Sequence, residues 1–385
     1  MTGKPSHLHL SDLRGAQHLA TAATLGITDL VEALHHTIVR APGPLGQSPP
    51  GRTDGISGLV YKSVRGITRL VGGSIDALLG LLAPLVAERP SSEEREALLA
   101  VVNGLFGDYL HDSGNPLAIA MQFRHSGIAL APDRAALAAA YPQATGRIAV
   151  LVHGLCMNDL QWTRNGHDHG AMLAREAGFT PVYLHYDTGR HISSNGRDLD
   201  ALLERLLREW PVPVERVAIV AHSMGGLVAR SACHYAAQGE SAWPAWLDAL
   251  VFLGTPHLGA PLERAGAWID YLVAISPYTA PFARLGKLRS AGIKDLRHGR
   301  ARDAQATLLP SGVRCYAVAA STQRPPRRTN GHLRGDGLVP VRSALGVALP
   351  ATRKWVAFGT GHLELMSSPD VYARMRSWLA GPARR

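Results

Sequence analysis

Apolar residues in the first third of the chain recur at helical spacing. Ile27, Leu30, Val31 and Leu34 mark one amphipathic run, and a second extends from Val60 to Val86. The Pro- and Gly-rich stretch 41–54 separates them, and a third helix is expected through about Leu110. These runs predict an N-terminal helical region over residues 1–115. Its helices could form a small bundle, or lie on a membrane through their apolar sides.

From about residue 116 the pattern changes to short apolar runs that alternate with helical segments. Parallel strands buried on both faces read as such continuous apolar runs. Strands are expected at 118–124, 128–131, 148–152, 182–186, 217–221, 250–253, 314–319 and 354–358, with helices at 198–210 and 227–237. Strands alternating with helices predict an α/β domain over 116–385 with a mainly parallel, doubly wound sheet.

A long segment, 258–310, interrupts this alternation. It carries Trp268, Tyr271, Leu272 and Tyr278, large side chains that could contact an acyl chain. Insertions of this length between strands are usually functional or form a subdomain. The segment is therefore a candidate lid or substrate-binding wall, and a helical cap that simply packs on the sheet is the alternative.

Composition narrows the class of protein. The chain has 385 residues, three cysteines and a formal net charge of +10. No compact basic block or zinc-finger spacing indicates nucleic-acid binding, although the cationic excess suits an anionic membrane surface. The longest apolar stretch, Ala77–Ala87, is too short to span a bilayer, and no secretory signal pattern opens the chain. We expect a cytoplasmic protein, with peripheral membrane contact through the N-terminal helices as an option; the oligomeric state is left open.

The strongest chemical signal lies in residues 217–228, where an apolar strand runs through Ala221-His-Ser-Met-Gly225 into a helix. This is the strand–turn–helix context of a nucleophile elbow, which exposes a serine hydroxyl above a sheet. Residues two before and two after the serine must be small because strand and helix backbones nearly touch there. Ala221 replaces the more usual glycine, and a single methyl group is tolerable. Ser223 is therefore the predicted nucleophile.

Oxyanion stabilisation is predicted from two backbone amides. The strand at 148–152 ends in His153-Gly154, and the loop after that strand supplies one N–H in proteins with such an elbow. The residue after the nucleophile supplies the other, which nominates Leu155 and Met224. Gly154 allows close approach of the backbone, and His153 is interpreted as a structural residue.

The base and its orienting acid are sought after the serine, in the order acid and then base. His362 lies in a Gly-rich loop after the last predicted strand, and Asp336 lies between two glycines after the strand at 314–319. Competing histidines are His257, His298 and His332, and Asp187 is the fallback acid.

Residues 147–380 together resemble bacterial lipases and esterases of the α/β-hydrolase superfamily, including the GPI inositol-deacylase group. The motifs that carry this resemblance are His153-Gly154-Leu155, Ala221–Gly226, Phe252–Gly259, Gly335–Val339 and Gly361–Leu363. It implies a Ser–His–Asp triad that hydrolyses carboxylic esters, of lipid or other acyl substrates, without a metal or other cofactor. No carboxylate cluster suggests a calcium site.

Two other functions stay open. A thioesterase or acyltransferase would use the same triad, since only the leaving group or acceptor differs. A membrane-associated scaffold with an inactive hydrolase domain is the non-enzyme alternative, against which the complete set of Ser223, Asp336 and His362 argues.

Overall fold

The computed structural model describes residues 9–40, 52–53, 55–82, 91–260, 290–298, 309–325, 335–346, 348–350 and 353–381. The chain divides into two compact units. Unit 1 comprises Met1–Arg95 and Gly114–Leu117, and unit 2 comprises Glu96–Ser113 and Ala118–Arg385.

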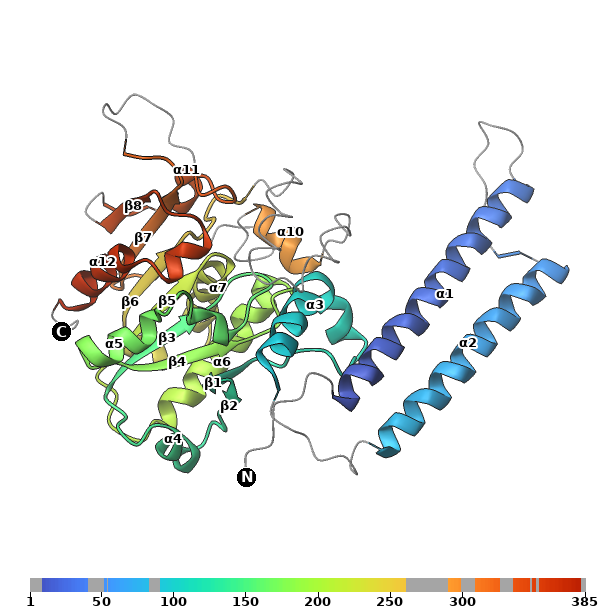
Figure 1. Cartoon of the computed structure of the whole chain (residues 1–385), viewed down its shortest axis with the longest axis horizontal. Helices are drawn as coiled ribbons and strands as arrows, with labels where there is room; N and C mark the ends of the chain where they lie inside the picture. The colour runs from blue at the N-terminus through green and yellow to red at the C-terminus, as the bar shows by residue number, and fades with distance from the viewer. Residues whose placement is uncertain are drawn as a thin grey trace. The chain divides into compact units, whose positions relative to one another are not determined.

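Unit 1 contains two long helices, α1 (Leu10–Arg40) and α2 (Gly55–Leu82), that run antiparallel as a hairpin (Figure 1). α1 is longer than the periodic run that predicted it, and α2 begins five residues before its predicted run, whose last residues lie outside the described part of the chain. Among the described residues no helix combines the length and apolar character that crossing a membrane requires.

Unit 2 is built on an eight-stranded sheet, and the predicted α/β, mainly parallel, doubly wound fold is confirmed (Figure 1). The strand order is β2-β1-β4-β3-β5-β6-β7-β8. The strands are β1 (Gln122–His125), β2 (Ile128–Ala129), β3 (Arg147–Val152), β4 (Thr180–His185), β5 (Arg216–His222), β6 (Leu247–Leu253), β7 (Arg314–Ser321) and β8 (Lys354–Phe358). β1 pairs antiparallel with β2 and β4, whereas every pairing from β4 to β8 is parallel.

Helices precede, connect and follow the strands of the sheet. They are α3 (Glu93–Asp112), α4 (Arg134–Ala140), α5 (His169–Ala177), α6 (Ile192–Arg208), α7 (Met224–Gln238), α10 (Ala291–His298), α11 (Val341–Ala344) and α12 (Pro369–Leu379), with short 3₁₀ turns η2 (Asp159–Trp162), η3 (Trp243–Trp246) and η6 (Leu363–Met366). After β3 the chain steps outward to β4, and after β4 it steps back past β3 to β5. Right-handed crossovers in opposite directions place α5 on one face of the sheet and α6 and α7 on the other.

The core lies between these layers. All residues of β5 and β6 are buried, as expected for central parallel strands covered on both faces. The carboxyl ends of the strands therefore meet at one edge of a rigid sheet, where ligand sites of open α/β folds occur.

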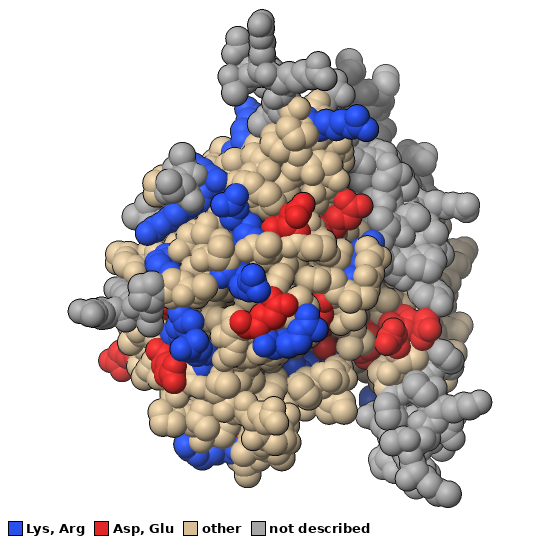
Figure 2. Space-filling view, turned by 60° about the vertical axis from the view of Figure 1, so that its left-hand side comes forward, with Lys and Arg blue, Asp and Glu red and all other residues tan. Residues whose placement is uncertain are grey.

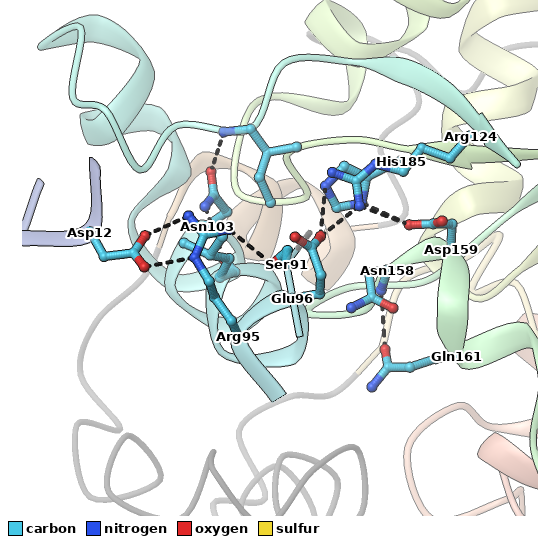
Figure 3. Close-up of polar contacts among 12 residues, drawn as sticks. Asp12, Ser91, Arg95, Glu96, Asn103, Arg124, Asn158, Asp159, Gln161 and His185 are labelled. Atoms are coloured by element: carbon cyan, nitrogen blue, oxygen red, sulfur yellow. Dashed lines mark hydrogen bonds and ion pairs between the residues drawn. The ribbon is translucent and has the colours of Figure 1, made fainter. Parts of the chain in front are cut away.

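Helix α3 differs from the sequence-based division, because residues 96–113 belong to unit 2 rather than to the helical region 1–115. A buried cluster of charged side chains holds α3 in unit 2 (Figure 3). Arg124 Nη1 lies 2.6 Å from Glu96 Oε2 and 3.4 Å from Asp159 Oδ1. His185 Nδ1 lies 3.3 Å from the same Asp159 oxygen. Burial alone would raise the pKa of Asp159, but His185 and Arg124 outweigh it and the pKa is lowered. The cluster ties α3 to β1, β4 and the loop that follows β3.

On the face of the molecule shown in Figure 2, Lys and Arg side chains are interspersed with Asp and Glu. The Lys and Arg side chains do not form a continuous basic stripe on that face.

Candidate active site

Ser223 sits where β5 ends and α7 begins. Its φ of 52° and ψ of −123° are strained for a residue with a side chain, and its amide donates to the Leu253 carbonyl at 2.8 Å. A Cβ atom at Gly225 would lie 2.5 Å from the carbonyl oxygen of Val152 and 2.6 Å from that of His153. Only glycine fits this crossing of helix and strand. The sharp turn predicted for the elbow is therefore present.

His362 follows β8 and caps the short turn η6. Its Nδ1 lies 2.7 Å from Asp336 Oδ2, and both side chains are almost completely buried. The second carboxylate oxygen of Asp336 accepts the backbone amides of Leu338 at 3.0 Å and Val339 at 2.8 Å. One oxygen is thus fixed by the loop, which aims the other at the imidazole.

His222 and Gly254 fix the position of His362 near Ser223. His222, which precedes Ser223, donates from Nε2 to the carbonyl oxygen of His362 at 3.0 Å. A Cβ atom at Gly254, directly after the Leu253 that binds the Ser223 amide, would lie 3.1 Å from His362 Cε1. The structure therefore brings Ser223, His362 and Asp336 to the carboxyl ends of β5 to β8.

His222 is a site residue that the sequence analysis did not single out. Burial, reinforced by the nearby His362, lowers the pKa of His222 well below its usual value, so the ring stays neutral. Its proton must lie on Nε2 to serve the carbonyl of His362. Its place in the Ala-His-Ser motif was visible, but its partner is 140 positions away in sequence.

The loop after β3 approaches the elbow closely. A Cβ atom at Gly154 would lie 3.1 Å from Ser223 Cβ and 3.0 Å from His222 Nδ1. Leu155 follows that glycine directly, and Met224 is the first residue of α7; both are buried. The two amides proposed as oxyanion donors thus belong to segments that flank Ser223.

Thr188 and helix α3 support this loop from behind. The Cys156 amide donates to Thr188 Oγ1 at 3.0 Å, and Cys156 has a positive φ of 59°. A Cβ atom at Gly104 of α3 would lie 2.3 Å from Cys156 Sγ, so the helix can approach only through a glycine. The sequence analysis missed both supports, because they depend on contacts between distant segments.

His153, directly after β3, is buried and uncharged. It stacks on Tyr186 with ring centroids 4.5 Å apart, and Tyr186 Oη donates to the His153 carbonyl at 2.9 Å. Burial lowers the pKa of His153 to about 3. The His153 imidazole is therefore buried and neutral.

The competing residues occupy other surroundings. His257 Nδ1 lies 3.1 Å from Arg230 Nη1, a cation that cannot orient a base as a carboxylate does. His298 Nδ1 donates to the Lys294 carbonyl of its own helix at 2.9 Å. His332 lies outside the described residues. Asp187 accepts from the Gly189 amide at 2.9 Å, and burial raises its pKa to about 7. Among the described residues, no histidine hydrogen-bonds to the Asp187 carboxylate.

Most of the predicted insertion, including Trp268, Tyr271, Leu272 and Tyr278, lies outside the described residues. Its described part, α10, packs into unit 2: Ser290 Oγ donates to the Gly104 carbonyl at 2.7 Å, and the Ala291 amide donates to Asp108 at 2.9 Å. In the part of the chain that the structure describes, no group of three or more metal-ligating side chains is placed to hold an ion.

Fold and site geometry together define an α/β-hydrolase fold. Residues 143–317 match the family model of the PGAP1-like alpha/beta domain, which confirms the resemblance expected from the motifs. The match includes Ser223 but ends before Asp336 and His362.

Solved structures show similarity at low identity. A lipase of Bacillus licheniformis is 19% identical, with 61% of this chain and 92% of that chain covered and a TM-score of 0.43. A thermophilic esterase from Thermogutta terrifontis is 18% identical, with 61% and 90% covered and a TM-score of 0.40. No curated protein sequence matches the chain.

Proposed function

We propose that this chain is a serine hydrolase that cleaves carboxylic esters through an acyl-enzyme, with Ser223 as nucleophile, His362 as base and Asp336 as orienting acid. The observation that carries the proposal is the buried 2.7 Å contact of Asp336 with His362 Nδ1, at the strand ends where Ser223 is held in its strained turn. A carboxylate on Nδ1 fixes that nitrogen as the donor and leaves Nε2 as the acceptor.

In the reaction, His362 Nε2 takes the hydroxyl proton while Ser223 Oγ bonds to the ester carbonyl carbon. The carbonyl oxygen becomes an oxyanion that accepts hydrogen bonds from the amides of Leu155 and Met224. The tetrahedral intermediate collapses as His362 returns the proton to the leaving alcohol. Water then attacks the acyl-enzyme by the same sequence and releases the acid.

The position of Met224 favours this assignment. It opens a 15-residue helix whose N-terminus points toward the reacting centre, where the helix dipole stabilises negative charge. Loss of one oxyanion donor costs about 3 kcal/mol of barrier in comparable sites.

The experiment is a panel of nitrophenyl esters of increasing acyl length, together with an acyl thioester, assayed with the full chain and with Ser223→Ala. The matched control is Ser231→Ala, also on α7 and fully buried; its hydroxyl has no hydrogen-bond partner among the described residues. We expect ester turnover by the wild type and by Ser231→Ala and its loss in Ser223→Ala. Turnover by Ser223→Ala at the wild-type rate would refute the proposal, and preference for the thioester would redirect it to a thioesterase.

A further inference from the structure

The hairpin of α1 and α2 is polar on the inside. Arg65 Nη1 contacts Glu32 Oε2 at 2.7 Å and Asp29 Oδ1 at 2.9 Å, and the Arg65 and Glu32 side chains are only 3% and 4% exposed. Further along, Arg14 Nε lies 2.7 Å from Asp76 Oδ1, which lowers the pKa of Asp76 to about 2. These ion pairs connect the two helices at two levels along the hairpin.

Two glycines of α2 lie on the same side of the helix as Arg65. Gly58, Arg65 and Gly72 are buried and spaced seven apart, so they share one side of the helix. A Cβ atom at Gly72 would lie 2.6 Å from Thr21 Oγ1 of α1, and Gln17 Nε2 donates to the Gly72 carbonyl at 2.9 Å. The side of α2 that faces α1 is therefore fixed.

The opposite side of α2 is apolar and exposed. Nine large apolar side chains on it are exposed: Ile56, Leu59, Val60, Val64, Ile67, Leu70, Val71, Ile75 and Leu78, with Ile56 83% and Leu70 72% exposed. At 100° per residue they span an arc of roughly 160°, centred away from Arg65. From Ile56 to Leu78 this surface extends over about 33 Å of the helix. Monomeric proteins rarely expose apolar surface on that scale.

The width of this surface, together with the net charge of the helix that carries it, favours a lipid bilayer as its occupant. A two-helix coiled coil uses a narrow seam of two positions per heptad, whereas helices that lie in a membrane interface present a broad apolar face. Lys62 and Arg69 are the exposed charged side chains of α2, and its one carboxylate, Asp76, is already paired with Arg14. Cations without competing exposed carboxylates complement anionic lipid headgroups.

We propose that the exposed face of α2 docks the protein in the plane of an anionic lipid surface, with the helix lying in the interface rather than crossing it. The apolar side chains from Ile56 to Leu78 enter the acyl boundary. Lys62 and Arg69 lie roughly 140° and 160° around the helix from the centre of the apolar arc, on its water side, and attract the anionic surface over the Debye length rather than by entering it. The polar contacts with α1 stay intact, because they lie on the other side of the helix. This inference is independent of the proposed ester hydrolysis.

The test is flotation of the full chain with vesicles of phosphatidylcholine alone and of phosphatidylcholine with phosphatidylserine. The variant Ile67→Glu/Leu70→Glu changes exposed positions only, and Ile128→Glu on β2, at 72% exposed, is the matched control. Circular dichroism of each variant checks that the helices are retained. We expect the wild type and the Ile128→Glu control to float with anionic vesicles, and the double variant to lose at least ten-fold in partitioning.

A charge variant tests the headgroup contribution separately. Lys62→Gln/Arg69→Gln should weaken binding to anionic vesicles by at most about 25-fold, since each cation near such a surface contributes up to about a factor of five. Failure of the wild type to float with either vesicle would overturn the proposal. Self-association that Ile67→Glu/Leu70→Glu abolishes, without vesicle binding, would overturn it in favour of a second copy of the chain.

Discussion

Replacing Asp336 by asparagine tests how the carboxylate controls His362. In the native site one oxygen accepts from the amides of Leu338 and Val339, and the other faces His362 Nδ1 at 2.7 Å. The carbonyl oxygen of asparagine must remain on the two amides, because an NH₂ group there would oppose two donors. The NH₂ group then points at Nδ1 and makes that nitrogen an acceptor.

That reversal places the imidazole proton on Nε2, the atom that must accept from Ser223. We therefore expect kcat to fall on the order of 10⁴-fold, equivalent to about 5 kcal/mol of barrier, while the fold is retained. The assay is turnover of a nitrophenyl ester that the wild type cleaves, with thermal unfolding as the check on structure.

The matched control is Asp187→Asn, which makes the same change at the other buried carboxylate considered as the acid. The asparagine oxygen can still accept the Gly189 amide, so we expect most of the activity to remain. Equal turnover by Asp336→Asn and wild type, or a larger loss in Asp187→Asn, would refute the reasoning.

Three further predictions concern the surroundings of the site. Thr188→Val removes the hydroxyl that accepts from the Cys156 amide, and we expect kcat to fall about ten-fold with little change in KM. Thr188→Ser keeps a hydroxyl and should retain the wild-type kcat. Equal kinetics for the two variants would exclude a positioning role for the hydroxyl. Burial raises the pKa of Asp187 to about 7 in the folded state, so between about pH 4 and 7 the folded protein keeps a proton that the unfolded chain has lost. The free energy of unfolding therefore falls by up to about 4 kcal/mol as pH rises through that window. Asp187→Asn should flatten this decline in urea unfolding. Gly225→Val should prevent folding, because its side chain would meet the Val152 carbonyl, and a soluble active variant would contradict that geometry.

Local patterns predicted the elbow well. The run from β5 through Ser223 into α7 needs only short-range information, namely an apolar strand, small residues at the crossing and a helix. The order of acid and base along the chain was enough to nominate Asp336 and His362. Their contact was outside the reach of sequence, because it depends on how two loops after β7 and β8 fold together.

Other features could not be predicted from the sequence, for physical reasons. Periodicity identified α3 as a helix but could not say which unit its glycines pack against, so the boundary at residue 115 placed it with the hairpin. Helix α5 begins with His169 and Gly170, both buried, and shows no apolar stripe to recognise. The apolar run of α2 predicted either a core face or a membrane face. The sequence did not show that the polar side of α2 is the side that contacts α1.

The central claim is that Ser223 is the nucleophile, and covalent labelling tests it most directly. The full chain is treated with a fluorophosphonate, which phosphonylates activated serines, and the adduct is located by peptide mass spectrometry. We predict one adduct, on Ser223, whose rate of formation falls in Asp336→Asn and which is absent from Ser223→Ala. Labelling at another residue, or an unlabelled wild type that still hydrolyses esters, would contradict the account.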